Sequence, residues 1–264
     1  MMRFIEETQD REEFAFRVLS ASMDSRIQEI HRVLIKPNIV SQEPYPTTTH
    51  PGVLRTVIQY FLRHCKEVLV TDAPAVDAGI SGTIIDSHPL KAVCDNCGIP
   101  MIDLSQCETR KLETDESSLE IFCAPLEYDL LISLPVLKSH IVCEITGALK
   151  NQFAFFTMEE RINMHFGRKD LHKGIAGINA IIKPDFYIVD AVETLTQANE
   201  VRHGGKPKRL GFMLAGTDPV AIDIAGLKLL QRVDPKLIGK SYKDIPYLRY
   251  AMNLGLGNAY QTDD

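Results

Sequence analysis

The amino-acid sequence predicts an α/β fold built on a layered, largely parallel β-sheet that is flanked by helices. Several short apolar runs have the length and the β-branched residues that are typical of buried strands. Between them lie segments whose apolar residues recur with the helical period, and strands that alternate with helices indicate parallel pairing. The runs that we interpret as strands cover residues 33–35, 68–70, 129–132, 186–189 and 211–214, with weaker candidates at residues 101–104 and 119–123.

The predicted helices begin and end at residues that favour such boundaries. Residues 52–64 place apolar side chains three and four positions apart, and Pro51 suits the first turn of that helix. Residues 83–97 form a second helical region, which Pro89 interrupts and Gly98 closes. The remaining predicted helices cover residues 171–182 and residues 219–230, the latter with Thr217 or Asp218 as its N-cap.

Two segments lack the period of either a helix or a strand. Residues 108–118 are polar and charged, and we expect them to form a surface connection. Residues 194–208 are expected to form a long loop, and loops of that length often carry function. The chain length permits one large domain or two small ones, and we expect one α/β domain over residues 1–264 with an irregular insertion.

Composition and charge argue against two classes of partner. The net charge is −6 and no long run of Lys and Arg offsets it, so a general nucleic-acid surface is not expected. The basic residues 202–209 include Gly and Pro, and we interpret them as an exposed loop. No run of 18 apolar residues occurs and the N-terminus lacks the apolar core of a signal peptide, so we expect a cytoplasmic protein that does not bind membranes.

The six cysteines are expected to be free thiols, because thiols stay reduced in the cytosol. Only Cys94 and Cys97 have the spacing of metal ligands. A zinc or iron–sulfur site usually requires a second pair or a clustered set of cysteines. We therefore expect no metal site and no iron–sulfur cluster in this chain.

Charged or hydrogen-bonding residues follow each of the five stronger strand candidates. In open α/β sheets the ligand binds outside the carboxyl ends of the strands, so these residues are candidate ligand contacts. Simpler roles are open to several of them: Lys36 could be solvated, Asp72 could form a turn, and Asp218 could cap the next helix. The candidates of this kind are Lys36, Asn38, Asp72, Lys138, Asp190 and Asp218.

Two features close to predicted helices require a partner. Thr49 and His50 precede the helix at residues 52–64, where they could bind an anion at its N-terminus or simply cap it. Asp223 lies within the otherwise apolar residues 219–230. A buried carboxylate there needs a Lys or the amides of a helix end as its partner.

Residues 133–156, S-L-P-V-L-K-S-H-I-V-C-E-I-T-G-A-L-K-N-Q-F-A-F-F, set cations among apolar side chains. If residues 143–156 are helical, Thr146 and Lys150 share one face. Lys150, next to Asn151, would then emerge among Phe side chains and be partly desolvated. Such a Lys has a lowered pKa and can act as a base or nucleophile. The alternative is a Lys whose apolar stem covers the core while its ammonium group reaches water.

Seven motifs in this order resemble the domain-of-unknown-function family 362, over roughly residues 33–257. The family has no generally established reaction, and many members carry a ferredoxin-like iron–sulfur module whose multi-Cys run is absent here. The resemblance therefore implies a family-362-type domain over residues 1–264 without that module. The motifs are V-L-I-K-P-N, T-H-P-G-V-L, T-D-A-P, L-P-V-L-K-S-H, I-T-G-A-L-K-N, K-P-D-F-Y-I-V-D and A-G-T-D-P-V-A-I-D.

A fainter similarity links the chain to the N-terminal domain of nickel-dependent lactate racemase. In that family a His is followed about ten residues later by a Lys that is tethered to a nickel-pincer nucleotide, and a later His binds the nickel. The similarity implies these roles for His140, Lys150 and His165. The sequence departs from that pattern in having A-L-K-N where a Gly-Gly-rich segment is expected, and in lacking a His directly after T-D-A-P.

These features predict a small-molecule or cofactor-binding enzyme with an anion-binding cleft at the carboxyl ends of the strands. Lys36, Lys138 and Lys150 would hold an anionic group such as phosphate or carboxylate, while the sequence identifies neither cofactor nor reaction. His140 would transfer a proton, because the unperturbed pKa of histidine lies near neutrality. The expected catalytic residues are His140 and Lys150, and the expected cofactor-binding residues are Lys36, Asn38, Thr49, His50, Asp72, Lys138, Thr146, Asn151, Asp190 and Asp218.

Two further expectations accompany this interpretation. Asp72, Asp190 and Asp218 would orient cations or hydroxyl groups, or would hold a divalent ion. The alternative function is a non-catalytic partner or scaffold for a separate iron–sulfur protein. Exposed Phe side chains at residues 153–156 would favour the scaffold, whereas burial of those side chains beside a polar cleft would favour the enzyme.

Overall fold

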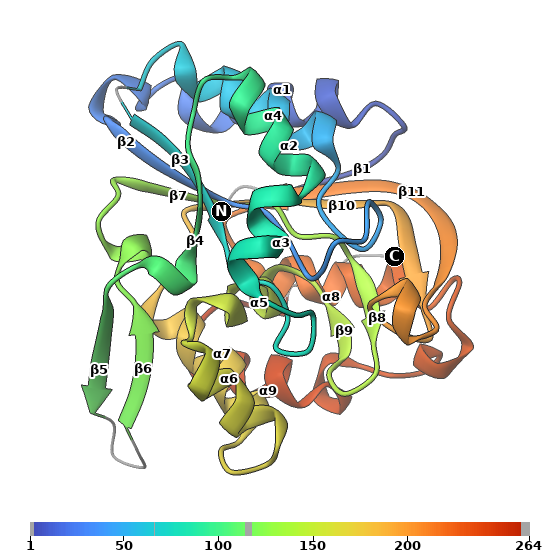
Figure 1. Ribbon diagram of the computed structural model, residues 1–264. Coiled ribbons are helices and arrows are strands. Elements are labelled where there is room, and N and C mark those ends of the chain that lie inside the picture. The colour runs from blue at the N-terminus through green and yellow to red at the C-terminus, as the bar shows by residue number, and fades with distance from the viewer. Residues whose placement is uncertain (1–2, 66, 114–117, 260–264) are drawn as a thin grey trace.

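A central mixed sheet organises the protein. The computed structural model describes residues 3–65, 67–113 and 118–259, and within them a seven-stranded sheet has the order β1-β11-β10-β7-β2-β3-β4 (Figure 1). Its strands are β1 (Arg3–Glu7), β2 (Arg32–Lys36), β3 (Glu67–Asp72), β4 (Met101–Asp103), β7 (Leu130–Ser133), β10 (Phe186–Thr196) and β11 (Lys206–Gly216).

The predicted α/β fold with a largely parallel sheet is confirmed, with one strand that runs the other way. Strands β10, β7, β2, β3 and β4 pair in parallel, whereas β11 is antiparallel to both β10 and β1. The carboxyl end of the strand at residues 211–214 therefore points in the opposite direction from the carboxyl ends of the parallel strands. Polar residues that follow β11 cannot meet those that follow β2 and β3.

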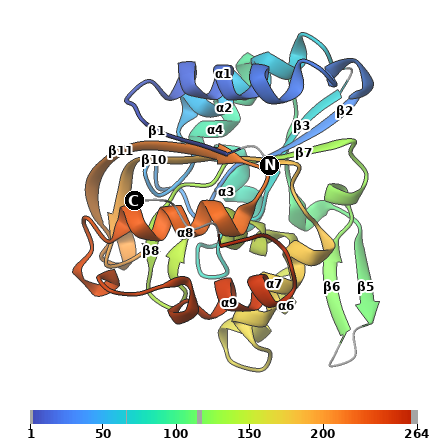
Figure 2. The ribbon, with the colours of Figure 1, turned by 180° about the vertical axis from the view of Figure 1, so that it is seen from behind.

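Helices cover both faces of the sheet, as Figures 1 and 2 show. In β2, Val33 and Ile35 pack on one face and Leu34 on the other, so an unbroken apolar run serves two hydrophobic cores. One face carries α1 (Arg11–Met23), α2 (Pro51–Leu62), α3 (Ser81–Ser87) and α4 (Pro89–Asn96). The other carries α5 (Ala148–Asn151), α6 (Met158–His165), α7 (Leu171–Ile181), α8 (Pro219–Leu230) and α9 (Pro246–Asn253).

The helix boundaries follow local chemistry. The predicted region at residues 83–97 is two helices, because Pro89 begins α4 and His88 accepts a hydrogen bond from the amide of Leu90 as its N-cap. Asp218 caps α8 in the same way by accepting from the amide of Ala221. The predicted helices at residues 52–64, 171–182 and 219–230 correspond to α2, α7 and α8.

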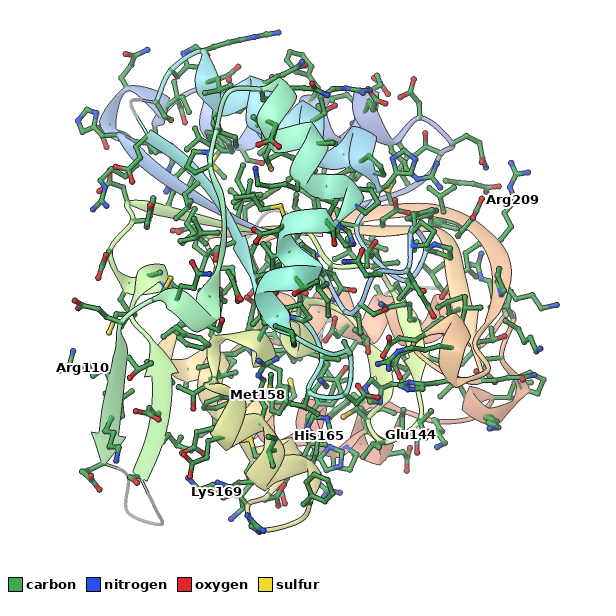
Figure 3. All side chains as sticks on the ribbon, in the orientation of Figure 1. Arg110, Glu144, Met158, His165, Lys169 and Arg209 are labelled. Carbon is green, nitrogen blue, oxygen red and sulfur yellow. The ribbon has the colours of Figure 1, made fainter. Side chains whose placement is uncertain are left out.

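Three local predictions were wrong. Residues 109–113 are not a plain connection, because β5 (Thr109–Glu113), whose side chains are largely exposed, pairs with β6 (Ser118–Phe122) in an antiparallel ladder. Arg110 on this hairpin lies at the edge of the molecule (Figure 3). Residues 114–117 of the predicted connection lie outside the described residues. Backbone pairing between the two strands forms this element, and amino-acid composition does not reveal such pairing.

The predicted long loop at residues 194–208 is shorter than expected, because both of its ends belong to strands. The β10–β11 ladder continues to the pair Thr196 and Lys206 beyond a bulge between Ala191 and Glu193, which leaves a shorter connection.

The segment 143–156 is not one helix either: β8 (Lys138–His140) pairs with β9 (Glu144–Thr146), and α5 begins after Gly147. Short 3₁₀ helices lie at Ile27–Glu29, Leu104–Gln106, Ala124–Leu126, Gln152–Phe155, Val201–His203, Pro235–Leu237 and Tyr242–Asp244. In the part of the chain that the structure describes, no helix has both the length and the apolar character to cross a membrane.

Candidate functional site

A cavity of about 360 Å³ opens at the carboxyl ends of the parallel strands. Lys36 ends β2 and Asp72 ends β3, and both line it. Strand β2 lies between β3 and β7, so the chain changes direction across the sheet at this point. Such a switch point leaves a crevice between the loops that leave neighbouring strands in opposite directions. The strand order therefore explains why the cavity lies at this point of the sheet.

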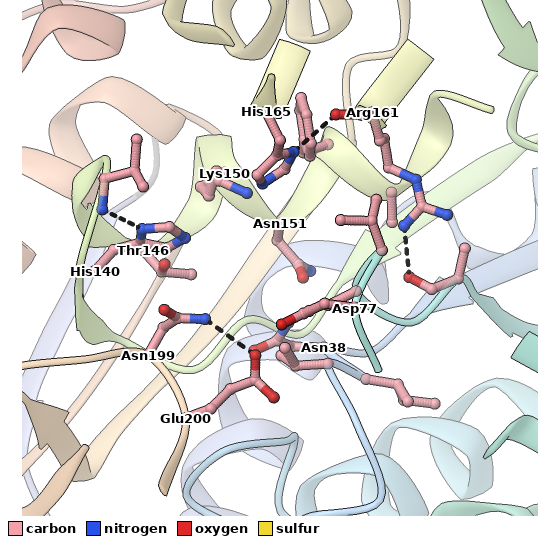
Figure 4. A pocket seen from close by; sticks show the side chains of 18 of the residues that line it. Asn38, Asp77, His140, Thr146, Lys150, Asn151, Arg161, His165, Asn199 and Glu200 are labelled. Carbon is pink, nitrogen blue, oxygen red and sulfur yellow. Dashed lines mark hydrogen bonds between the residues drawn. The ribbon is translucent and has the colours of Figure 1, made fainter. Parts of the chain in front are cut away.

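Most of the predicted site residues meet at this cavity, although they come from four separate segments of the chain. Figure 4 shows Lys150, His140 and His165 on one side, with Glu200, Asn199 and Asp77 across from them. The predicted residues that line the cavity are Lys36, Asn38, Asp72, Lys138, His140, Thr146, Lys150, Asn151 and His165.

Lys36 is fully engaged by the protein. Its ammonium group donates to Asp72 at 2.7 Å, to the carbonyl of Pro37 at 3.0 Å and to the side-chain oxygen of Asn151 at 3.3 Å. Asp72 in turn accepts from the amides of Ile39 and Ala73. The three N–H groups of Lys36 thus meet three acceptors, and none is left for a ligand. The ion pair between Lys36 and Asp72 joins the ends of β2 and β3.

Lys138 is held less completely. It donates to the side-chain oxygen of Asn38 at 2.8 Å and to the carbonyl of Thr47. Burial lowers its pKa to about 7, against the attraction of Glu200. Desolvation disfavours the charged form of an amine, so this side chain can change protonation state close to neutral pH.

Lys150 has no hydrogen-bonding or ionic partner among the described residues. It lies near the end of α5 with its ammonium group 4.3 Å from the ring centre of Phe153, and among the described residues it forms no hydrogen bond or ion pair. Burial lowers its pKa, and the nearby cations Arg161 and Lys36 lower it further. The side chain is thus a desolvated donor that faces the cavity.

Asp223 explains why α5 begins where it does. Its carboxylate accepts from the amides of Ala148 and Leu149, the latter at 3.2 Å, and so caps the first turn of α5. Burial raises the pKa of Asp223 to about 7. The requirement for a buried partner is therefore met by amides at a helix end and not by Lys150. The carboxylate positions Lys150 through the backbone of α5.

Arg161 is a further cation of the cavity without an acidic partner among the described residues. It lies on α6, is 3% exposed, and donates to the carbonyl of Pro74 at 2.6 Å and to that of Ala73 at 3.3 Å. Its Nε has no hydrogen-bond partner among the described residues. Burial lowers its pKa to about 10, so the guanidinium still carries its charge at neutral pH. Carbonyl groups solvate this charge without neutralising it.

The two histidines present opposite chemistry to the cavity. Nδ1 of His140 accepts from the amides of Val142 at 3.0 Å and Cys143 at 3.1 Å, so the ring proton belongs on Nε2. Burial and the adjacent Lys150 and Lys138 hold the pKa of His140 well below its usual value. His140 is therefore a neutral hydrogen-bond donor.

His165 has the other tautomer. Its Nδ1 lies 2.8 Å from the carbonyl of Arg161, which can only accept, so Nδ1 carries the proton and Nε2 keeps its lone pair. Burial lowers the pKa of His165, and the adjacent Lys150 contributes to that shift. One ring therefore offers a proton and the other a base. Thr146 adds a buried hydroxyl without a partner among the described residues.

The wall across from Lys150 carries two acids that share one arginine. Arg202 binds Glu200 at 2.7 Å and Asp77 at 2.8 Å, and His203 lies 3.0 Å from Asp77. Ligand atoms of Asp77, Glu200 and His203 lie within 4.8 Å of one another, which is close enough for a metal ion. A single guanidinium therefore serves two carboxylates, and it offsets one of their two negative charges.

Four predicted site residues lie outside the cavity. Thr49 is buried and bonds to the amide of Asn38 and the carbonyl of Leu134, so it supports Asn38 from behind. His50 caps α2 by accepting from the amide of Gly52. Both residues stabilise the backbone that carries the cavity wall.

The two remaining residues are Asp190 and Asp218. Asp190 lies within β10, not after it, and accepts from Arg11 at 2.8 Å and from Tyr45 at 2.9 Å. Asp218 caps α8 at the far edge of the sheet, because β11 is antiparallel. It lines a separate cavity of about 320 Å³ there.

Sequence patterns did not point to Arg161 or to Glu200. Arg161 and His165 are four residues apart on α6, so they share a face, and this spacing was the available signal. Glu200 follows β10 in a segment without periodicity and joins the cavity only because the β10–β11 hairpin folds over it. Tertiary structure alone identifies that residue.

Comparisons with known proteins agree with the fold. The lactate racemase apoprotein from Thermoanaerobacterium thermosaccharolyticum superimposes with a TM-score of 0.58 at 12% identity, over 87% of this chain and 57% of that one. The faint similarity seen in the sequence is confirmed at the level of fold. A protein from Thermotoga maritima gives a TM-score of 0.47 at 13% identity, over 84% of this chain and 57% of that one.

Sequence comparison gives a curated relative and a family. The thylakoid-associated protein sll1697 from Synechocystis is 26% identical over 216 residues, which are 78% of this chain and 65% of that protein. The chain thus spans about two thirds of the length of this relative. The sequence model described as Domain of unknown function (DUF362) matches residues 33–228. This protein belongs to the DUF362 family.

Proposed function

We propose that this protein is an enzyme that binds a small molecule or cofactor through an anionic group at the carboxyl ends of its parallel strands. The observation that carries the proposal is the pair Lys150 and Arg161. Both cations line one cavity, and neither has an acidic partner among the described residues. Desolvated charges are costly unless they are paired, and an anionic ligand would supply the missing charge.

The groups around these cations suit proton transfer to or from the bound molecule. His140 donates from Nε2, and the Thr146 hydroxyl is a further donor. Nε2 of His165 is a base, and a neutral fraction of Lys150, which its lowered pKa favours, is a second. In this proposal Lys150 and His140 are catalytic, and Asn38, Lys138 and Asn151 shape the anion site. The role predicted for Lys36 becomes structural.

The same contacts weigh against the scaffold alternative. Phe153, Phe155 and Phe156 are 4%, 0% and 0% exposed, so they form no surface patch for an iron–sulfur partner. Phe153 lines the cavity and packs against Lys150. We also propose that the protein works in the cytoplasm, because all six cysteines are free thiols.

Anion binding by Lys150→Met tests the proposal. Calorimetric titration with inorganic phosphate at low ionic strength is expected to show binding to the parent. In Lys150→Met the binding free energy should weaken by roughly 1.5–3 kcal/mol, because a charge-assisted hydrogen bond is lost. Lys208→Met removes the same charge from an exposed strand position outside the cavity and serves as the control. Equal phosphate binding by all three proteins would contradict the proposal.

A further inference from the structure

The rim of the cavity carries large apolar side chains that face solvent. Ile141, Val142 and Phe166 are 60%, 54% and 75% exposed, and all three line the cavity. Ile141 and Val142 form the turn between β8 and β9, and Phe166 follows the end of α6. Single exposed apolar residues are ordinary on protein surfaces. Three at one rim, from two separate elements, form an apolar opening above the buried cations.

The size of the cavity exceeds what a bare anion requires. At about 360 Å³ it has the volume of roughly a dozen water molecules and falls within the range of small-molecule sites. The cavity therefore has room for a ligand that extends beyond an anion at Lys150 and Arg161.

The chemistry of the remaining wall determines what that extension is. Glu200 and Asp77 already bind Arg202, and Lys36 already donates to three acceptors, so these groups are engaged within the protein. The rest of the lining is mostly apolar and includes Ile39, Val40, Val76, Phe153 and Ala154.

Resting on the proposed function, we propose that the ligand is amphipathic: a carboxylate or phosphate joined to an apolar alkyl or aryl body. The anion binds Lys150 and Arg161, with His140 as an additional donor. The apolar body covers Phe166, Ile141 and Val142 and removes their surface from water, which contributes affinity in proportion to the area buried. This arrangement gives both the unpaired cations and the exposed apolar rim a partner in one molecule.

Matched ligand pairs test this inference. Calorimetric titration compares acetate with octanoate, and inorganic phosphate with phenyl phosphate, so that within each pair the apolar body is added to the same kind of anion. The parent should bind the apolar member roughly tenfold or more tightly in at least one pair. Comparison of acetate with inorganic phosphate identifies which anionic head the site prefers, because neither carries an extended apolar body.

Rim variants locate the effect. Phe166→Ser and Ile141→Ser should each weaken binding of the apolar ligand several-fold and leave binding of the small anion unchanged. Ile238→Ser is the matched control, because Ile238 is 67% exposed and does not line the cavity. Lys150→Met should weaken binding of both members of each pair.

The outcomes separate this inference from the proposed function. Equal affinities within both pairs, or rim variants no different from Ile238→Ser, overturn the amphipathic ligand and leave the anion site standing. Apolar binding that persists undiminished in Lys150→Met also overturns it, because the apolar body would then bind without its anion. If none of the four compounds binds the parent, the proposed function fails together with this inference.

Discussion

Two lysines of the same cavity show what separates a structural cation from one that can serve a ligand. Lys36 donates to three acceptors within 3.3 Å, including the carboxylate of Asp72. Lys150 contacts the ring of Phe153 and, among the described residues, no acceptor. Burial lowers the pKa of both side chains. The comparison teaches that burial of a cation identifies a candidate site only where the protein supplies no partner for the charge.

The largest expected effect is on the paired lysine. Lys36→Met leaves the Asp72 carboxylate buried without its counter-charge, and we expect a loss of roughly 3–5 kcal/mol in the free energy of unfolding. Denaturant unfolding measures it. The double variant Lys36→Met with Asp72→Asn should recover part of the loss, because no unpaired charge remains. A single variant as stable as the parent would show that Lys36 is not structural.

Asp223, the acid that could have paired with Lys150, gives a pH-dependent test. Its pKa rises from 3.8 to about 7 on folding because burial disfavours the carboxylate. The folded state therefore keeps this proton over the range in which the unfolded chain has lost it. The resulting stability is fully present below about pH 4 and is lost as the pH rises through about 7.

In the parent protein, ionisation of Asp223 alone should lower the free energy of unfolding by on the order of 3 kcal/mol between pH 4 and pH 8. Asp223→Asn keeps an acceptor oxygen for α5 but removes the titration. Unfolding curves at several pH values should therefore have a shallower pH dependence in the variant, by about one proton. Identical slopes would mean that the Asp223 pKa is not raised.

Gly147 connects this carboxylate to the site. A Cβ at position 147 would lie 2.1 Å from the Asp223 carboxylate, so Gly147→Ala forces the start of α5 away from its cap. We expect a loss of about 1–3 kcal/mol in stability from this overpacking. Phosphate binding should weaken as well, because Lys150 moves with α5 although its own chemistry is unchanged.

Gly177→Ala is the control for this change. Gly177 lies within α7, and a Cβ there would meet no atom within 4 Å. Alanine favours a helix over glycine by roughly 0.8–1 kcal/mol, so this variant should gain stability and bind phosphate as the parent does. If Gly147→Ala behaves in the same way as Gly177→Ala, the close approach of Asp223 to α5 does not position Lys150.

The fold was predictable where the hydrophobic pattern decides it. The runs at residues 33–35, 68–70 and, apart from the exposed Asp129, 129–132 contribute to the hydrophobic cores on both faces, so apolar composition alone predicts β2, β3 and β7. The direction of β11 was not predictable, because composition does not encode whether a strand runs parallel to its neighbour. That reversal separates Asp218 from the cavity. Local sequence thus predicts whether a segment is a helix or a strand, whereas the direction of a strand depends on the topology of the whole sheet.

The site residues were also difficult to predict, because their roles depend on contacts between residues that are distant in the sequence. The motifs V-L-I-K-P-N and A-L-K-N each place a Lys after apolar residues, so the sequence does not distinguish Lys36 from Lys150. Their difference depends on Asp72, which lies 36 residues from Lys36 and, of these two lysines, accepts a hydrogen bond from Lys36. Arg161 was missed because its partners are backbone carbonyls, which leave no mark in the sequence.

The smallest effect on stability is expected for the unpaired lysine and completes the comparison. Lys150→Met keeps the length and apolar stem of the side chain and removes a desolvated charge that satisfies no acceptor in the described residues. We expect the free energy of unfolding to change by less than about 1 kcal/mol, or to increase, because no buried carboxylate loses its partner.

Denaturant unfolding of Lys150→Met beside Lys36→Met measures this difference directly. Each variant makes the same substitution at the same cavity, so side-chain volume and helix or strand preference are poor explanations for a large gap between them. A loss of roughly 3–5 kcal/mol in Lys150→Met, with phosphate binding unchanged, would mean that the charge has a structural partner. Lys150 would then leave the site, and Arg161 alone would be the unpaired cation on which anion binding depends.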